Sequence, residues 1–98
     1  MMNNYPTGKE LKALRDLLCK DPDGMAALLA RTREAYADLE KNGIITSVDA
    51  RFTKQCLECF LAEGPYKEGE EKGIKDPEIA RMVVERREAI QNFISRLG

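Results

Sequence analysis

The chain has 98 residues, of which 43% are apolar and 34% are charged, and its formal net charge is −1. This composition is typical of one folded domain and excludes an intrinsically disordered chain. Sixteen basic residues are balanced by seventeen acidic ones, so the sequence lacks the excess positive charge that drives nonspecific binding to nucleic acid. We expect no membrane span, because no run approaches the ~18 apolar residues that a span requires.

The cysteine and histidine content limits which cellular compartment and which chemistry the sequence can indicate. Three cysteines, an odd number, do not suit a secreted disulfide scaffold, and the first ten residues have no apolar core of the secretory kind. We therefore expect reduced thiols and a cytoplasmic protein. Histidine is absent, which removes the commonest general base and the commonest metal ligand. With no glycine-rich phosphate loop and no serine in a nucleophile setting, the sequence predicts no enzyme and no cofactor.

Helix signals in the first half of the chain predict two helices. The first is predicted over residues 7–19, because Thr7 opens a capping box. The second is predicted over residues 22–42, from Asp21, a cap residue that precedes a proline, to a stop at Gly43. Its apolar stripe lies close to a heptad seam and consists of Met25, Leu28, Leu29, Thr32, Tyr36 and Leu39.

Two further helices are predicted in the second half. The third is expected over residues 47–63 with Ser47 as its cap, and residues 64–75, rich in glycine and charge, are expected to form a mobile surface loop. The last and longest helix is expected over residues 76–97, capped by Asp76. The prediction is one all-α domain, residues 1–98, folded as a compact antiparallel four-helix bundle with the third helix in the centre.

Cys56 and Cys59 lie three residues apart on the predicted third helix. Theirs is the one spacing in the chain that resembles a metal or redox site. A zinc site needs four ligands, and a redox pair needs a thiol pKa lowered by a helix N-terminus or a cation. The sequence offers neither, so we expect both thiols to pack in the core as small apolar groups. Cys19 falls off the apolar stripe of the first predicted helix, which consists of Leu11, Leu14, Leu17 and Leu18, so it is the thiol that reagents should reach first. The broad apolar arc of the third helix comprises Val48, Phe52, Cys56, Leu57, Cys59, Phe60 and Leu61.

The last helix carries a charge within its apolar arc, at Arg86. A charge there must reach water, pair with a carboxylate, lie at a subunit interface or bind an anionic ligand. Arg87, at the edge of the arc, is expected to be a solvated flank. Because this helix should be longer than its partners, we expect surplus apolar surface for another chain, formed by Arg86, Ile90, Phe93, Ile94 and Leu97.

These features favour a small protein–protein interaction module that self-associates, as a homodimer, through the last helix. The alternative is a nucleic-acid-binding regulator, because residues 35–60 predict a helix, a short glycine turn and a second helix. Asp49 and the slight negative charge of the chain weigh against nucleic acid. The residues that would then contact it are Ser47, Arg51, Lys54 and Gln55.

Overall fold

The structure, a computed structural model, describes residues 4–98. Every regular element in this range is helical, so the prediction of an all-α chain with its longest helix at the C-terminus is confirmed. The elements in chain order are α1 (Gly8–Leu17), α2 (Pro22–Leu28), α3 (Arg33–Asn42), α4 (Ser47–Glu63), the 3₁₀ helix η1 (Glu70–Gly73) and α5 (Pro77–Ser95).

Side-chain caps begin α1, α2 and α5 at the residues that the sequence indicates, and the cap of α4 differs by one position. Thr7, Asp21 and Asp76 each accept a hydrogen bond from a backbone N–H of the first turn, at 3.2, 2.7 and 2.9 Å. These bonds satisfy donors that a helix N-terminus otherwise leaves free. The cap of α4 is Thr46 and not Ser47, which is the first helical residue. The prediction was wrong by one position because the two hydroxyl residues are adjacent.

The single helix expected over residues 22–42 is two helices, α2 and α3. Ala30 adopts a left-handed conformation with φ 53°, and the N–H of Arg31 bonds the carbonyl five residues earlier at 2.9 Å. This Schellman pattern ends α2 without a glycine. Thr32, expected in an apolar stripe, instead caps α3. α1 ends in the same way, with Cys19 at φ 56°.

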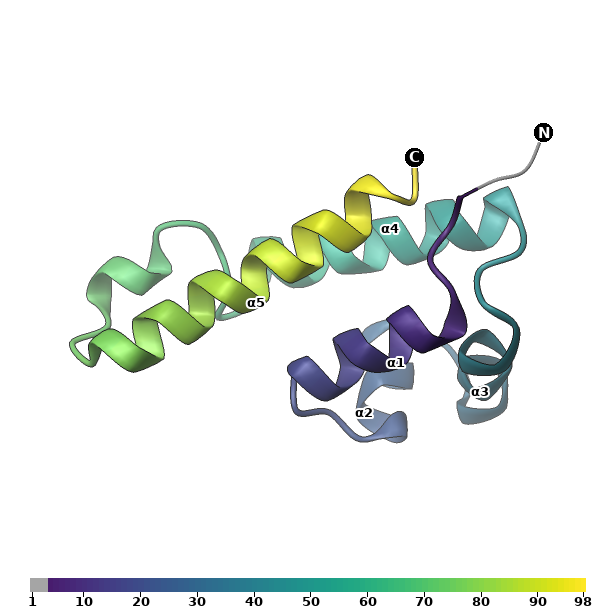
Figure 1. Cartoon of the computed structure of the whole chain (residues 1–98), viewed down its shortest axis with the longest axis horizontal. Coiled ribbons are helices and arrows are strands. Elements are labelled where there is room, and N and C mark those ends of the chain that lie inside the picture. Colours follow the sequence, from purple (N-terminus) through teal and green to yellow (C-terminus); the bar gives the residue numbers. More distant parts are fainter. Residues whose placement is uncertain (1–3) are drawn as a thin grey trace.

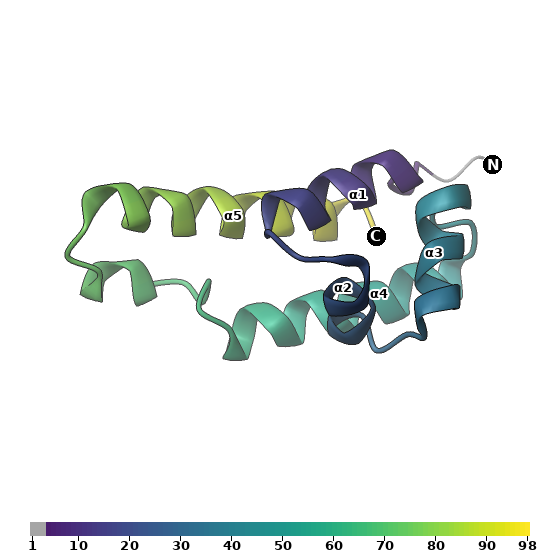
Figure 2. The same cartoon turned by 90° about the horizontal axis from the view of Figure 1, so that it is seen from below.

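The helices form two layers that are joined at one end by α3. Figure 2 shows α1 beside α5 in one layer and α2 crossing α4 in the other. α4 and α5 run in opposite directions, and the N-terminal half of α5 extends with η1 beyond the first three helices (Figure 1). The molecule is therefore elongated, with principal extents of 44 × 28 × 20 Å.

α4 is covered by the chain on one face only. Its buried residues are Ala50, Thr53 and Leu57, whereas Val48 is 63% and Phe52 41% exposed. The prediction of a central third helix assumed that the whole broad apolar arc is buried. Splitting the second predicted helix leaves the short α2, and not a long helix, against α4, so three of the seven residues of that arc, Val48, Phe52 and Cys59, stay exposed.

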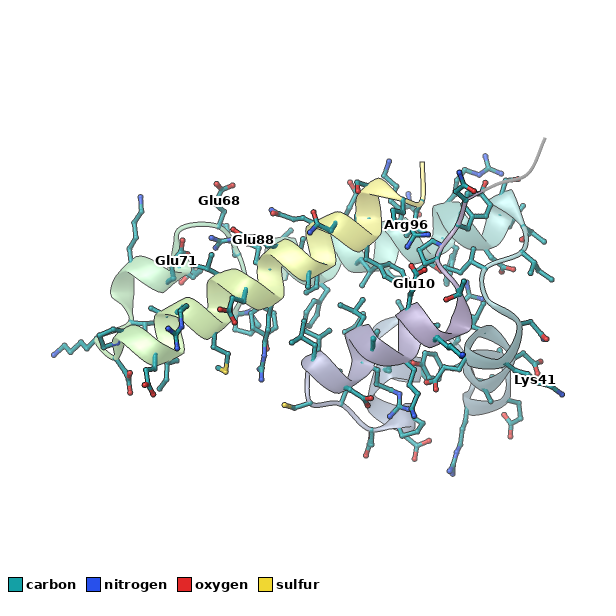
Figure 3. All side chains as sticks on the ribbon, in the orientation of Figure 1. Glu10, Lys41, Glu68, Glu71, Glu88 and Arg96 are labelled. Carbon is teal, nitrogen blue, oxygen red and sulfur yellow. The ribbon has the colours of Figure 1, made fainter. Side chains whose placement is uncertain are left out.

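Polar contacts and one close approach hold α1 against its neighbours. Arg15 donates to both carboxylate oxygens of Glu40 on α3, at 2.8 and 3.2 Å. Arg96, after the last turn of α5, pairs with Glu10 on α1, and Figure 3 shows the two side chains facing each other. At Gly8 the backbones of α1 and α3 approach so closely that a Cβ would overlap the carbonyl group of Glu40.

The segment 64–75, expected to be a mobile loop, is tied to the rest of the chain. Tyr66 is buried, and Glu71 accepts two hydrogen bonds from Arg87 on α5, at 2.8 and 2.9 Å. Arg87 also donates to the carbonyl of Lys67 and is itself buried, which corrects its prediction as a solvated flank. These bonds from the Arg87 guanidinium hold the pKa of the Glu71 carboxyl at about 2.

Candidate functional site

The predicted interface residues on the last helix lie mostly inside the chain. Ile90, Phe93 and Leu97 are 0, 7 and 3% exposed, and Ile94 is half-buried against the same core. The first three therefore offer no surface to a second chain, which corrects their assignment to an interface. The physical reason is that the C-terminal half of α5 packs on α1 and α4, and its N-terminal half is the part that extends past its partners.

Arg86, the fifth predicted interface residue, is half-buried, and its guanidinium contacts other residues of the same chain. Its guanidinium donates to the hydroxyl of Tyr66 at 2.9 Å and lies 3.2 Å from the sulfur of Cys19. The hydrogen bond to Tyr66 raises the pKa of the guanidinium. Arg86 therefore joins three segments of the chain. Because neither partner is a carboxylate, it does not form a salt bridge within the described part of the chain.

The two cysteines of α4 do not share the buried position predicted for them. Cys56 is half-buried against the core, whereas Cys59 is exposed. The buried face of α4 is centred on Thr53 and Leu57, so the side that carries Cys59 turns outward. Burial raises the pKa of the Cys56 thiol, which lowers its thiolate fraction at neutral pH, the reverse of a redox-active cysteine.

The outward side of α4 has a seam of its own. Residues spaced alternately four and three apart follow one line along the helix, the spacing that coiled-coil helices use to meet a partner helix. Within this line the apolar side chains lie at the N-terminal end and the small ones at the C-terminal end. We call it the outer seam, and it consists of Val48, Phe52, Gln55, Cys59 and Ala62. All five residues are exposed.

A groove lies on each side of the outer seam at Phe52 and Gln55. The larger, of about 640 Å³, is bounded by the end of α2 and has a largely apolar lining that comprises Leu28, Ala30, Phe52, Gln55, Cys56, Cys59, Phe60, Glu63 and Gly64. The smaller, of about 510 Å³, is lined by Val48, Arg51, Phe52, Lys54, Gln55 and Glu58. Phe52 and Gln55 thus form a ridge between two hollows, the surface relief that a second helix can interlock with.

Arg31, in the connection between α2 and α3, supports this ridge. Its guanidinium lies 5.1 Å from the ring centre of Phe52, within the range of a cation–π contact. It also donates to the buried hydroxyl of Thr53 at 3.2 Å and to Asp49 at 3.4 Å. The Phe52 ring is therefore held from one side by a residue that is itself fixed to α4.

The predicted nucleic-acid contacts also lie on α4. Ser47, Arg51 and Gln55 are exposed, but Lys54 donates to the carbonyl of Gly98 at 2.7 Å and is partly covered. The segment does contain two helices joined by a short turn, as the sequence indicates. Val48 and Phe52 line the same groove as Arg51, Lys54 and Gln55, so apolar side chains border the surface that would face DNA.

Comparisons with family models, with curated proteins and with solved structures find no match to this chain. Across residues 4–98, no helix is both long enough and apolar enough to cross a membrane. The same part of the chain brings together no cluster of three cysteine, aspartate or glutamate side chains that could hold a metal ion. The outer seam and its two grooves are therefore the feature on which we base a function.

Proposed function

We propose that this chain is a protein–protein interaction module that binds a helix of its partner along the outer seam of α4. The observation that carries the proposal is the exposure of Val48 and Phe52 on a helix whose opposite face is fully packed. Phe52 stands between two grooves, and aromatic side chains of this kind are enriched in the buried centre of protein interfaces. An amphipathic helix laid into an apolar groove is a recurrent mode of recognition.

The rim of the surface agrees with a protein partner. Arg51 and Glu58 flank the seam on the same side, and Glu63 borders the larger groove. An apolar centre with a mixed polar rim is the usual anatomy of a protein interface, whereas a nucleic-acid surface is predominantly basic. No observation favours the nucleic-acid alternative over this one.

The last helix also exposes apolar side chains. Ile79 and Met82, in the N-terminal half of α5, are the large apolar residues that it leaves exposed. Self-association through α5 would have to use this half, because Ile90, Phe93 and Leu97 in the other half are buried. The cytoplasm remains our proposed location, because an odd number of cysteines, two of them at the surface, suits a reducing compartment.

A photo-crosslinking amino acid placed at Gln55 tests the proposal in cells that express the chain. We expect an adduct with a protein, and we expect Phe52→Glu to abolish it without changing the circular dichroism of the purified chain. The matched control places the crosslinker at Lys12, which is exposed on α1 away from the seam. Equal adducts from both positions, adducts that survive Phe52→Glu, or an adduct with nucleic acid would each refute the proposal.

A further inference from the structure

We propose that the outer seam of α4 pairs with the outer seam of a second copy of this chain, with the two helices antiparallel about a two-fold axis. This inference rests on the proposed function and names its partner. In a two-fold interface every contact occurs twice, because residue i of one copy meets residue j of the other and the reverse. The distribution of charge and size along α4 suits such a contact.

The register follows from the spacing of the seam. With the two-fold axis between residues 53 and 54, Val48 lies opposite Cys59 of the partner, and Phe52 lies opposite the partner's Gln55. Each large side chain then meets a smaller one, as helices packed ridge into groove require. The seam itself has no charged residue, so the register buries no unpaired charge.

The charges beside the seam select this orientation. Arg51 and Glu58 are exposed, are seven residues apart on the same side of α4, and form no ion pair within residues 4–98. In the antiparallel register Arg51 of each copy faces Glu58 of the other, so two complementary pairs form. In a parallel pair the flank of one copy that carries Glu58 would meet the opposite flank of the partner, which carries Glu63, and like charges would repel.

Charge reversal separates this pairing from other modes of association. Sedimentation equilibrium of the full chain from 10 to 500 μM, at low salt, should show a monomer–dimer equilibrium. Arg51→Glu places two glutamates opposite each other at both ends of the contact, and Glu58→Arg does the same with arginines. We expect each single variant to weaken dimerisation at least about tenfold, which corresponds to about 1.4 kcal/mol, and the double variant to restore it.

Lys12→Glu is the matched control, because it makes the same charge change on α1 away from the seam, and it should leave the equilibrium unchanged. Three results would overturn the proposal. They are a monomer at 500 μM, a dimer that tolerates both single reversals, and a double variant that remains as weak as the single ones.

A disulfide test reads the register directly. In a Cys19→Ser, Cys56→Ala background, Val48→Cys should form a covalent dimer under mild oxidation, joined by residue 48 of one copy and Cys59 of the other. The two positions are eleven residues apart on one helix, about 16 Å, so they cannot bridge within a chain. Adding Cys59→Ser should abolish the covalent dimer. A link between two copies of residue 48 that survives this change would show a parallel pair and overturn the register.

The two experiments also separate this inference from the proposed function. A purified chain that stays monomeric, but forms an adduct from Gln55 with a different protein in cells, refutes self-pairing and leaves the outer seam as an interface. A purified chain that dimerises as described, with itself as the adduct in cells, supports both. A monomer with no protein adduct refutes both.

Discussion

Gly8→Ala should destabilise the fold, although alanine is the better helix former. The substitution gains at most about 1 kcal/mol in helix propensity. At Gly8, however, the new Cβ would overlap the backbone carbonyl of Glu40, and backbone atoms cannot rotate away as a side chain can. α1 must then move away from α3, which loosens the packing of Leu11 and stretches the hydrogen bonds between Arg15 and Glu40, now 2.8 and 3.2 Å long.

The free-energy cost of the overlap at Gly8 should exceed the gain in helix propensity. Overpacking costs roughly 1–3 kcal/mol and can cost more, and lengthening a charge-assisted pair adds roughly 1 kcal/mol, so we expect a net loss of about 2 kcal/mol. For a domain of this size that lowers Tm by roughly 8–16 °C. Urea unfolding followed by circular dichroism at 222 nm measures the loss. Gly73→Ala, whose Cβ would meet no atom within 4 Å, is the control and should stay within about 0.5 kcal/mol of wild type. A Gly8→Ala chain as stable as wild type would refute the close approach of α1 and α3.

Three further predictions test other parts of the fold. Ala30→Gly should raise the free energy of unfolding by about 1 kcal/mol, because glycine adopts the left-handed conformation without strain. Ala27→Gly, inside α2, should lower it by a similar amount. If both variants changed the free energy of unfolding in the same direction, the end of α2 at Ala30 would be contradicted. Leu57→Ala should cost about 2–5 kcal/mol and Phe52→Ala under about 1 kcal/mol, and the reverse order in urea unfolding would show that α4 is turned the other way. Because the pKa of Glu71 falls from 4.5 to about 2 on folding, its carboxylate stabilises the fold above pH 4.5, and this contribution is lost as the pH falls towards 2. Thermal unfolding between pH 7 and pH 2 should therefore be less pH-dependent in Glu71→Gln, and identical pH profiles would contradict the ion pair.

The helix ends that the sequence predicts correctly are those with a local chemical signal. Thr7, Asp21 and Asp76 cap helices through their own side chains, and Gly43 reaches φ 78° at the end of α3. The break at Ala30 has no such signal, because an alanine in the left-handed conformation looks like any other helix former. Thr32, two residues later, caps α3, but a single threonine inside an otherwise helical pattern does not predict that the helix breaks.

The orientation of α4 depended on information that a single sequence does not carry. Seven apolar residues spread around the helix indicate burial on several sides, but the number of neighbours decides how much of that arc is covered. The buried Thr53 is the clearest example. It is favoured in the core by a hydrogen bond from Arg31, 22 residues away, which no periodicity reveals. The pairing of Arg87 with Glu71 was missed for the same reason, since it joins residues 16 positions apart across a turn.

Arginine side chains join segments that are distant along this chain, from Arg15 with Glu40 to Arg96 with Glu10. The cation of guanidinium chloride is chemically the same group as the arginine head, so this denaturant competes for those carboxylates as well as solvating the backbone. Urea is uncharged and leaves the pairs to be broken by unfolding alone. The two denaturants should consequently extrapolate to different stabilities in water, with the lower value from guanidinium chloride, and the gap should narrow when urea titrations are repeated in concentrated sodium chloride.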